Sequence, residues 1–373
     1  MMEIQKLSQL LHTDLQYICD SLDKEFTQMS GQKLLITGGA GFLGYYLVQS
    51  ALHWNQGRSL EKKIHVTVYD NYIRGIPTWL TSLGKRDDLD VLKVNMIEPL
   101  PAVMPDYSYI IHAAGIASPI YYRKYPIETM DANINGLRSL LEYGRSQESK
   151  GTPVQGFLFY SSSEIYGDPS PDQIPTSEGY RGNVSCTGPR ACYDESKRYG
   201  ETLCVNFAQQ YGLPVKVARP FNNYGPGLKI TDRRVLPDFV RNVFSGKDIV
   251  MLSDGSPTRT FCYSADAIIG YYKVLVKGRK GEAYNVGVEK PEISIRTLAD
   301  KVVSIASDLF DYKGKVVHKK DVEDDYLVDN PNRRCPIIEK ARRELGYNPT
   351  ILIDEGLKRS LIWYHYNRSA EEA

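Results

Sequence analysis

Three glycines at a strand–helix junction constrain the fold of this chain more than any other feature. The stretch LLITGGAGFLGYYL places Gly38, Gly41 and Gly44 between an apolar run and a helical pattern. At such a junction the first glycine permits a tight turn. The second lets a pyrophosphate approach backbone N–H groups at the helix N-terminus, and the third lets helix and strand pack closely. This GxxGxxG spacing, in its strand–helix context, predicts a dinucleotide site.

Strands and helices are expected to alternate from this junction to about residue 220. Apolar runs predict strands, and helical patterns predict the helices between them. The expected strands are residues 33–39, 64–71, 90–96, 107–115, 156–164 and 214–222, and the expected helices are 42–54, 131–147 and 193–212. Such alternation gives a parallel sheet with helices on both faces. We therefore expect an α/β protein with a Rossmann-type doubly wound parallel sheet and a smaller C-terminal lobe.

Three regions are expected along the 373 residues. Residues 1–31 predict an N-terminal amphipathic helix that ends before Gly31 and packs on its own domain or on a partner subunit. Residues 32–220 form the dinucleotide-binding domain. Residues 221–373, where Gly and Pro become frequent, mainly form a substrate-binding lobe, with segments that return to the main domain. The apolar stripe of the N-terminal helix consists of Ile4, Leu7, Leu11, Leu15, Ile18 and Leu22.

The composition excludes several classes of partner. A net charge of +1 leaves no basic surface for nucleic acid or for an anionic membrane. No apolar run approaches transmembrane length, and the N-terminus carries charged residues without the apolar core of a signal peptide. The six cysteines show neither a CxxC motif nor metal-ligand spacing with histidine. We therefore expect reduced thiols, no metal site and a cytoplasmic location.

A carboxylate at the end of the second strand indicates which dinucleotide is bound. Asp70 follows the glycines at about the distance at which a carboxylate accepts hydrogen bonds from the ribose hydroxyls. It would repel a 2′-phosphate, which favours NAD over NADP. Arg74 lies nearby and weakens this preference.

Tyr193 and Lys197 stand four residues apart in the stretch GPRACYDESKRYGE. On a helix these positions lie one above the other on the same face. An ammonium beneath a phenol favours the phenolate, because a nearby positive charge lowers the pKa of an acid. The spacing is consistent with a catalytic base, although the same pattern is also typical of a surface ladder of ion pairs.

Motifs spread over most of the chain resemble one enzyme family. They are, in order, TGGAGFLG, YDN, HAAG, SSSEIYGDP, YDESK, RPFNNYGPG and TRTFCYSAD. From about residue 32 to 360 the chain resembles the extended short-chain dehydrogenase/reductases that modify nucleotide sugars. The resemblance implies that Tyr193 and Lys197 act on the sugar C4 hydroxyl and bind the nicotinamide ribose. It also implies a homodimer built partly on the helix that carries Tyr193.

Within that family the resemblance is strongest to the branch of UDP-glucuronate decarboxylases. It rests on GPRACYDESKR, SSSEIYGDP and SPTRTFCYSAD. The 4,6-dehydratases carry an aspartate where this chain has Ser163, and the 4-epimerases generally lack a carboxylate at the position of Glu164. The resemblance thus implies NAD-dependent decarboxylation of UDP-glucuronate to UDP-xylose or its 4-keto pentose, through a 4-keto intermediate. The alternatives are a nucleotide-sugar 4-epimerase or 4,6-dehydratase. A non-catalytic dinucleotide-binding regulator is disfavoured, because the YxxxK motif and Ser162 are intact.

The resemblance also implies roles for individual residues. Arg259 would serve either the carbon dioxide step or the diphosphate, and His112 belongs to the loop under the cofactor rather than to the acid–base chemistry. The expected cofactor-binding residues are Gly38, Gly41, Phe42, Leu43, Gly44, Asp70, Asn71, Asn95, Met96, Ala113, Ala114, Gly115, Asn133, Tyr193 and Lys197. The expected catalytic residues are Ser162, Ser163, Glu164, Tyr193, Lys197 and Arg259, and the expected substrate-binding residues are Asn222, Arg234, Arg259 and Arg334.

Some stretches depart from the pattern of the family. Asn95 and Met96 replace an Asp followed by an aliphatic residue at the adenine-binding strand. The segments RPFNNYGPGL, TDRRVLPDF and RRCPII also differ, and all three belong to the nucleotide- and sugar-binding part. These departures leave the redox chemistry intact, but they leave the base and the sugar open.

Overall fold

The computed structural model describes residues 2–318 and 331–372, and its centre is a seven-stranded sheet. The strand order is β11-β6-β5-β4-β1-β2-β3, and every neighbouring pair is parallel. The strands are β1 (Lys33–Thr37), β2 (His65–Asp70), β3 (Leu89–Lys93), β4 (Tyr109–His112), β5 (Gly156–Tyr160), β6 (Val215–Pro220) and β11 (Ala283–Val286). This sheet confirms the predicted Rossmann-type α/β fold.

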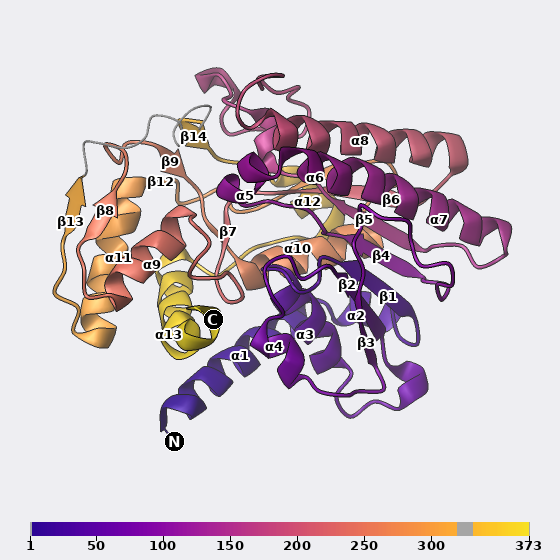
Figure 1. Cartoon of the computed structure of the whole chain (residues 1–373), viewed down its shortest axis with the longest axis horizontal. Helices are drawn as coiled ribbons and strands as arrows, with labels where there is room; N and C mark the ends of the chain where they lie inside the picture. The colour runs from indigo at the N-terminus through magenta and orange to yellow at the C-terminus, as the bar shows by residue number, and fades with distance from the viewer. Residues whose placement is uncertain (1, 319–330, 373) are drawn as a thin grey trace.

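Helices cover both faces of the sheet because successive strand residues point to opposite sides (Figure 1). Leu34 and Ile36 of β1 belong to one buried cluster, together with α3 (Gly44–Trp54) and α10 (Ser264–Lys277). Leu35 belongs to the cluster on the opposite face, with α7 (Leu137–Ser149) and α8 (Ala191–Tyr211). The buried strands therefore read as continuous apolar runs.

The order of the strands reverses at β1. The chain moves from β1 outward to β2 and β3, then crosses back so that β4 pairs with the other side of β1. Loops that leave the carboxyl ends of β1 and β4 consequently diverge and open a crevice, which is where ligands bind in such sheets. Short elements line the approach to this crevice, namely α4 (Thr78–Ser82), α5 (Pro119–Lys124), α6 (Pro126–Asp131), the π-helical turn η2 (Ala132–Gly136) and the 3₁₀ turn η3 (Ser163–Tyr166). Two further 3₁₀ turns are η1 (Leu60–Lys62) and η4 (Pro171–Gln173).

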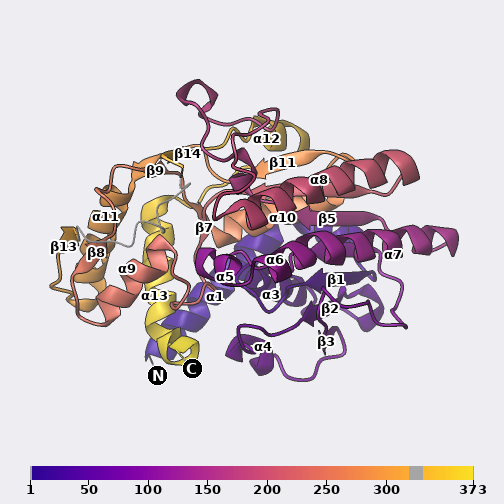
Figure 2. The ribbon, with the colours of Figure 1, turned by 45° about the horizontal axis from the view of Figure 1, so that its top comes forward.

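The second half of the chain forms a smaller lobe beside the crevice (Figure 2). Three small sheets support it, pairing β7 (Asn223–Tyr224) with β10 (Cys262–Tyr263), β8 (Ile249–Met251) with β13 (Val316–His318), and β9 (Thr258–Arg259) with both β12 (Ile293–Ser294) and β14 (Arg333–Arg334). Its helices are α9 (Val235–Phe244), α11 (Ile295–Phe310) and α13 (Ile353–Glu372). Strand β11, α10 and α12 (Glu339–Leu345) pack with the main sheet instead. Of the predicted lobe, residues 319–330 and 373 lie outside the described residues.

The N-terminal segment forms two helices, α1 (Met2–Ser21) and α2 (Asp23–Gln28), where a single helix was predicted. The chain turns at Leu22, so that Phe26 enters the core and Glu25 meets Lys273 and Lys277 on α10. Asp23 and Glu25 lie in the first turn of α2, where negative charge stabilises a helix N-terminus.

The segment packs on its own chain, against α3, α10 and α13. Asp14 is fully buried there and accepts hydrogen bonds from Tyr46, Tyr263 and Arg359. Tyr17 reaches Asp266 on α10, with 2.6 Å between the hydroxyl and Oδ1. Of the expected apolar stripe, only the side chain of Ile4 lies outside the described residues.

Two further observations apply to the described parts of the chain. Within residues 2–318 and 331–372, no helix combines the length and the apolar character needed to cross a lipid bilayer. All six cysteines are free thiols, and four of them are buried.

Candidate active site

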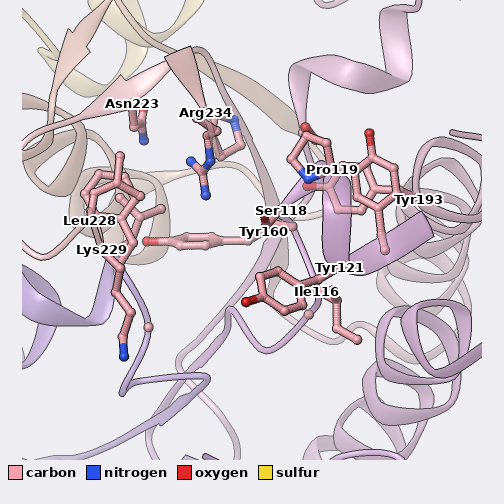
Figure 3. Close-up of a pocket in the computed structure, with 18 of the residues that line it drawn as sticks. Ile116, Ser118, Pro119, Tyr121, Tyr160, Tyr193, Asn223, Leu228, Lys229 and Arg234 are labelled. Carbon is pink, nitrogen blue, oxygen red and sulfur yellow. The ribbon is translucent and has the colours of Figure 1, made fainter. Parts of the chain in front are cut away.

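A cavity of about 900 Å³ lies in the crevice between the sheet and the lobe. It is large enough to hold small-molecule ligands. Every predicted site residue except Asn133 lines this one cavity. In the view of Figure 3, Tyr193 stands on one side and Arg234 and Asn223 on the other, with Tyr121 and Tyr160 between them. The structure thus brings residues from both halves of the chain together, although their roles stay predictions.

The glycine junction forms a cradle that a side chain would fill. Gly38 has a φ of +73°, and a Cβ atom there would lie 2.6 Å from the backbone nitrogen of Ala114. A Cβ atom on Gly44 would lie 2.0 Å from the carbonyl oxygen of Gly39. Backbone atoms therefore occupy the space that side chains would need at the start of α3. Gly41, Phe42 and Leu43, which precede this helix, also line the cavity. This geometry fits the pyrophosphate of a dinucleotide at a helix N-terminus.

Asp70 connects the end of β2 to this cradle. Its Oδ2 accepts a hydrogen bond from the backbone N–H of Ala40 at 3.0 Å, and its Oδ1 accepts one from Tyr72 at 2.8 Å. Burial raises the pKa of Asp70, while these two hydrogen bonds oppose the shift. Arg74, which weakened the preference for NAD, instead pairs with Asp232 of the lobe at 2.8 Å. Its charge is therefore already matched by a carboxylate.

The remaining predicted cofactor residues surround the cradle. Asn71, Asn95 and Met96 follow β2 and β3, and Asn71 Nδ2 donates to Asn95 Oδ1 at 3.4 Å. Ala113, Ala114 and Gly115 follow β4.

Asn133 lies behind Gly115 in the π-helical turn, where its Nδ2 donates to Ser196 Oγ at 2.9 Å. Among the described residues its buried Oδ1 has no hydrogen-bond partner, as expected of a group that meets a ligand or an ordered water. His112 is buried between Thr37, whose Oγ1 lies 2.7 Å from its Nδ1, and the stacked ring of Phe159. Burial lowers the pKa of His112 to about 3, so this side chain is a neutral support for the loop.

Tyr193 and Lys197 occupy the first two turns of α8 and are both buried. Lys197 Nζ donates to the carbonyl oxygen of Tyr160 at 2.8 Å and lies 5.7 Å from the centroid of the Tyr193 ring. The ring of Tyr122 stacks on that of Tyr193, with 5.2 Å between the centroids. Ser162 follows β5 and caps the turn η3, since its Oγ accepts from the N–H of Glu164.

Burial dominates the pKa of Tyr193 in the chain alone. Burial raises it to about 12, whereas a hydrogen bond with Ser162 and the charge of Arg234 lower it. Burial also lowers the pKa of Lys197 to about 7. In the chain alone, desolvation outweighs the attraction, and the ammonium is directed at a backbone carbonyl. The expectation that Lys197 and the positive nicotinamide ring together hold the pKa of Tyr193 down concerns the complex with NAD+ and stays a prediction.

Glu164 is held between two arginines from distant parts of the chain. Arg334 of β14 binds both of its carboxylate oxygens, with 2.7 Å between Nη2 and Oε2, and Arg190 binds Oε2 as well. Burial opposes ionisation, yet Arg190 and Arg334 lower the pKa of Glu164 to about 2. Glu164 is thus a fixed anion at neutral pH and cannot serve as a general acid.

A third arginine stands next to this cluster. Arg259 of β9 is the register partner of Arg334 on β14. Its guanidinium donates to the carbonyl oxygens of Pro331 at 2.6 Å and Asn332 at 3.1 Å. Burial and the charge of Arg334 lower the pKa of Arg259 to about 9. Three guanidinium groups therefore converge around Glu164, while Asp194 beside Arg190 supplies only part of a second negative charge because its pKa is raised to about 7, and the site favours a further anion.

The other predicted substrate residues lie where β6 passes into the lobe. Asn222 has a φ of +42°, and its Nδ2 donates to the carbonyl oxygen of Thr260 at 2.9 Å. Arg234 immediately precedes α9, and its guanidinium carbon lies 5.8 Å from the centroid of the Phe42 ring. Arg234 thus reaches toward the glycine cradle from the lobe.

Three residues beyond the predicted catalytic, cofactor-binding and substrate-binding residues also belong to the site. Arg190 holds Glu164, Tyr122 stacks on Tyr193, and Asp194 lies 3.7 Å from Arg190 Nε. Burial and the charge of Glu164 raise the pKa of Asp194 to about 7. The only signal for Arg190 and Asp194 was their position within one helical turn of Tyr193, which does not distinguish a buried pair from a surface one.

Comparison with known proteins was made on the whole chain. Residues 34–287 match the NAD dependent epimerase/dehydratase family. UDP-glucuronic acid decarboxylase 6 of Arabidopsis thaliana is 33% identical over 331 residues, which are 88% of this chain and 87% of that protein. UDP-glucuronic acid decarboxylase 1 of Xenopus tropicalis is 32% identical, covering 94% of this chain and 75% of that protein. The solved structure of epimerase Mth375 from Methanothermobacter thermautotrophicus has a TM-score of 0.78 and 25% identity, covering 94% of this chain and 96% of that one.

Proposed function

The chain belongs to the NAD dependent epimerase/dehydratase family, and we propose that it removes the C6 carboxylate of UDP-glucuronate as carbon dioxide. The product would be UDP-xylose or its 4-keto pentose. The names of the relatives support this substrate, and the carboxylate of Glu164 beside Ser163 supports decarboxylation over dehydration or epimerisation.

One observation carries the proposal. Arg190, Arg259 and Arg334 surround Glu164 and keep an excess of positive charge at the sugar end of the pocket. A neutral hexose would leave that charge unmatched, whereas a sugar acid supplies the missing anion. The fork of a guanidinium binds a carboxylate with two hydrogen bonds, so Arg259 is the leading candidate for the C6 carboxylate.

The glycine cradle and Asp70 would hold NAD+, which would supply the acceptor for the hydride of sugar C4. Tyr193 takes the proton of the C4 hydroxyl, and Ser162 donates a hydrogen bond to the same oxygen. Because the pKa of Tyr193 is about 12 in the protein alone, positive charge next to the phenol is needed to reach the phenolate near neutral pH. The ammonium of Lys197 would supply part of that charge once it turns toward the ribose and the phenol.

Oxidation at C4 makes the C6 carboxylate that of a β-keto acid. The bond between C5 and C6 then breaks, and its electron pair delocalises onto the 4-keto oxygen. Ser162 and protonated Tyr193 stabilise this enolate through hydrogen bonds. Protonation at C5 completes the loss of carbon dioxide, and Glu164 keeps the arginines in place throughout.

A homodimer in the cytoplasm is also part of the proposal. Apolar side chains are exposed on α6 and α8, which pack side by side: Ile127 is 64% exposed, Met130 38% and Tyr199 50%. Burying such a surface against a second copy would stabilise an interface on the helix that carries Tyr193. The free thiols of the six cysteines are consistent with a reducing compartment.

The deciding experiment is a mass-resolved incubation with UDP-glucuronate and NAD+. Loss of one carbon dioxide without net NADH is the expected result and means that the hydride returns to the product. The same loss with stoichiometric NADH means that the 4-keto pentose is released. An unchanged mass with a new isomer would refute decarboxylation in favour of epimerisation, and loss of water would identify a dehydratase.

A further inference from the structure

A buried carboxylate joins the cofactor domain to the lobe on the side of the pocket away from Tyr193. Asp232 is fully buried, and its Oδ2 accepts a hydrogen bond from Arg74 Nη1 at 2.8 Å. The Nε of Arg234 lies 2.9 Å from Oδ1 of the same carboxylate. Arg74 follows β2, whereas Asp232 and Arg234 directly precede α9. Segments that are 158 residues apart therefore share one ion cluster.

The cluster carries more positive than negative charge. Lys229 joins it, because its Nζ donates to the carbonyl oxygen of Arg74 at 2.8 Å. Two cations thus meet the single carboxylate of Asp232, and Lys229 adds a third positive charge beside Arg74. Figure 3 shows the side chains of Lys229 and Arg234 on this side of the pocket. A diphosphate is the ligand group whose charge matches such a surplus.

Arg74 lines the cavity, and it can also act on the diphosphate indirectly through the carboxylate that it shares with Arg234. If Asp232 paired with Arg234 alone, the two charges would cancel and little attraction for a phosphate would remain. Because Arg74 shares the carboxylate, part of the positive charge of Arg234 stays unneutralised. The contact with Asp232 still fixes the orientation of the Arg234 guanidinium. The ring of Tyr121, 4.9 Å from the Arg74 guanidinium carbon, holds Arg74 from the other side.

We propose that Arg74 is a positioning residue for the diphosphate of the nucleotide sugar, acting through Asp232 on Arg234. The inference rests on the proposed function in one respect, namely that the ligand is a nucleotide diphosphate. The cofactor carries the same chemical group, and Phe42 of the glycine cradle lies close to Arg234. The test must therefore separate the two diphosphates.

The experiment is calorimetric titration of the full-length protein saturated with NAD+, which occupies the cofactor diphosphate site. The two probes are UDP and inorganic pyrophosphate, and NAD+ binding is measured separately. The variants are Arg74→Ala and Arg74→Lys. Arg86→Ala is a control for the loss of a comparable ion pair, since Arg86 pairs with buried Asp88 at 2.7 Å and its side chain is 30% exposed as in Arg74, but Arg86 is not among the residues that line the pocket.

We expect Arg74→Ala to weaken both probes about tenfold, as for the loss of one partly screened charge, and to change NAD+ affinity less than about twofold. Arg74→Lys should recover affinity to within about threefold of the wild type, and Arg86→Ala should bind as the wild type does. Unchanged affinity in Arg74→Ala would overturn the inference. It would also be overturned by an Arg74→Lys variant as weak as the alanine variant, or by an equal loss of NAD+ binding. A wild type that binds pyrophosphate but not UDP would refute the proposed nucleotide, while the pyrophosphate titrations still decide the role of Arg74.

Discussion

Replacing Asp14 by alanine should destabilise the protein by about 3–4 kcal/mol, although Asp14 lies in the N-terminal segment and outside the pocket. Its carboxylate is fully buried and accepts hydrogen bonds from Tyr46 on α3, Tyr263 on β10 and Arg359 on α13. Truncation leaves two buried hydroxyls without an acceptor, and each such group costs roughly 1–3 kcal/mol. Removing one partner of a buried ion pair costs about 3–5 kcal/mol. We take the lower part of these ranges, because Arg359 is 20% exposed and keeps its second partner, Glu355.

Thermal unfolding followed by circular dichroism is the assay. A chain of 373 residues has an unfolding entropy of about 0.8 kcal/mol/K, so the expected loss lowers Tm by about 4–5 °C. Asp20→Ala is the control on the same helix, since Asp20 is exposed and bonds only to Gln16 among the contacts described. It should shift Tm by less than about 1 °C.

A double variant separates this network from a general effect on helix α1. If Asp14 acts through Tyr263, the loss in Asp14→Ala/Tyr263→Phe should be clearly smaller than the two single losses added together. An Asp14→Ala protein that melts with the Asp20→Ala control would refute the reasoning, because the carboxylate would then contribute nothing. Additive losses would show that the hydroxyl of Tyr263 finds another acceptor.

Three further predictions concern the pocket. Tyr193→Phe should lower kcat by at least about 10³-fold while NAD+ affinity stays within about threefold, measured by turnover and by calorimetry; activity near that of the wild type would exclude Tyr193 as the base. The pKa of Asp194 is raised to about 7 in the folded protein, whereas an unfolded chain ionises the same group near pH 4. The free energy of unfolding therefore falls as pH rises from about 4 to 7 and does not change further above pH 7 on account of this group. Asp194→Asn cannot ionise, so its free energy of unfolding, measured by urea titration, should rise relative to that of the wild type by up to about 1.4 kcal/mol per pH unit between pH 4 and 7. A difference between the two proteins that stays constant with pH would contradict the raised pKa. Glu164→Gln should raise KM for UDP-glucuronate and lower kcat by about 10² or more, because Arg190 and Arg334 lose the anion that holds them; an unchanged kcat with an intact Tm would remove Glu164 from the mechanism.

Local patterns were sufficient to predict the central fold. The glycine junction and the alternating apolar runs specify β1, α3 and the parallel sheet, because backbone conformation and burial act over a few residues there. The pair Tyr193 and Lys197 was predicted in the same way, from a spacing of one helical turn. The break at Leu22 was missed because helical periodicity continues through it, whereas tertiary contacts of Glu25 with α10 decide the turn.

The arrangement around Glu164 could not be predicted from the sequence. Arg334 lies 170 residues away along the chain, and only the pairing of β14 with β9 brings it to the carboxylate. The burial that raises the pKa of Tyr193 in the chain alone was also not predicted, since Tyr122, which stacks on its ring, lies 71 residues away along the chain. The sequence was thus enough to name the candidate residues, whereas their ionisation states and contact partners depend on long-range packing.

The pairing of Arg259 with Arg334 on adjacent strands makes the substrate a structural element of the lobe. Like charges directly opposite one another disfavour a strand pair, and Glu164 offsets only part of this repulsion. A sugar carboxylate would complete the neutralisation, so the small sheet of β9, β12 and β14 gains cohesion from the molecule that it binds. A lineage that turned to uncharged sugars would first have to replace one of these arginines, because the same repulsion that selects for an acid would otherwise weaken the sheet. Substrate preference and the integrity of this lobe are therefore expected to change together in evolution.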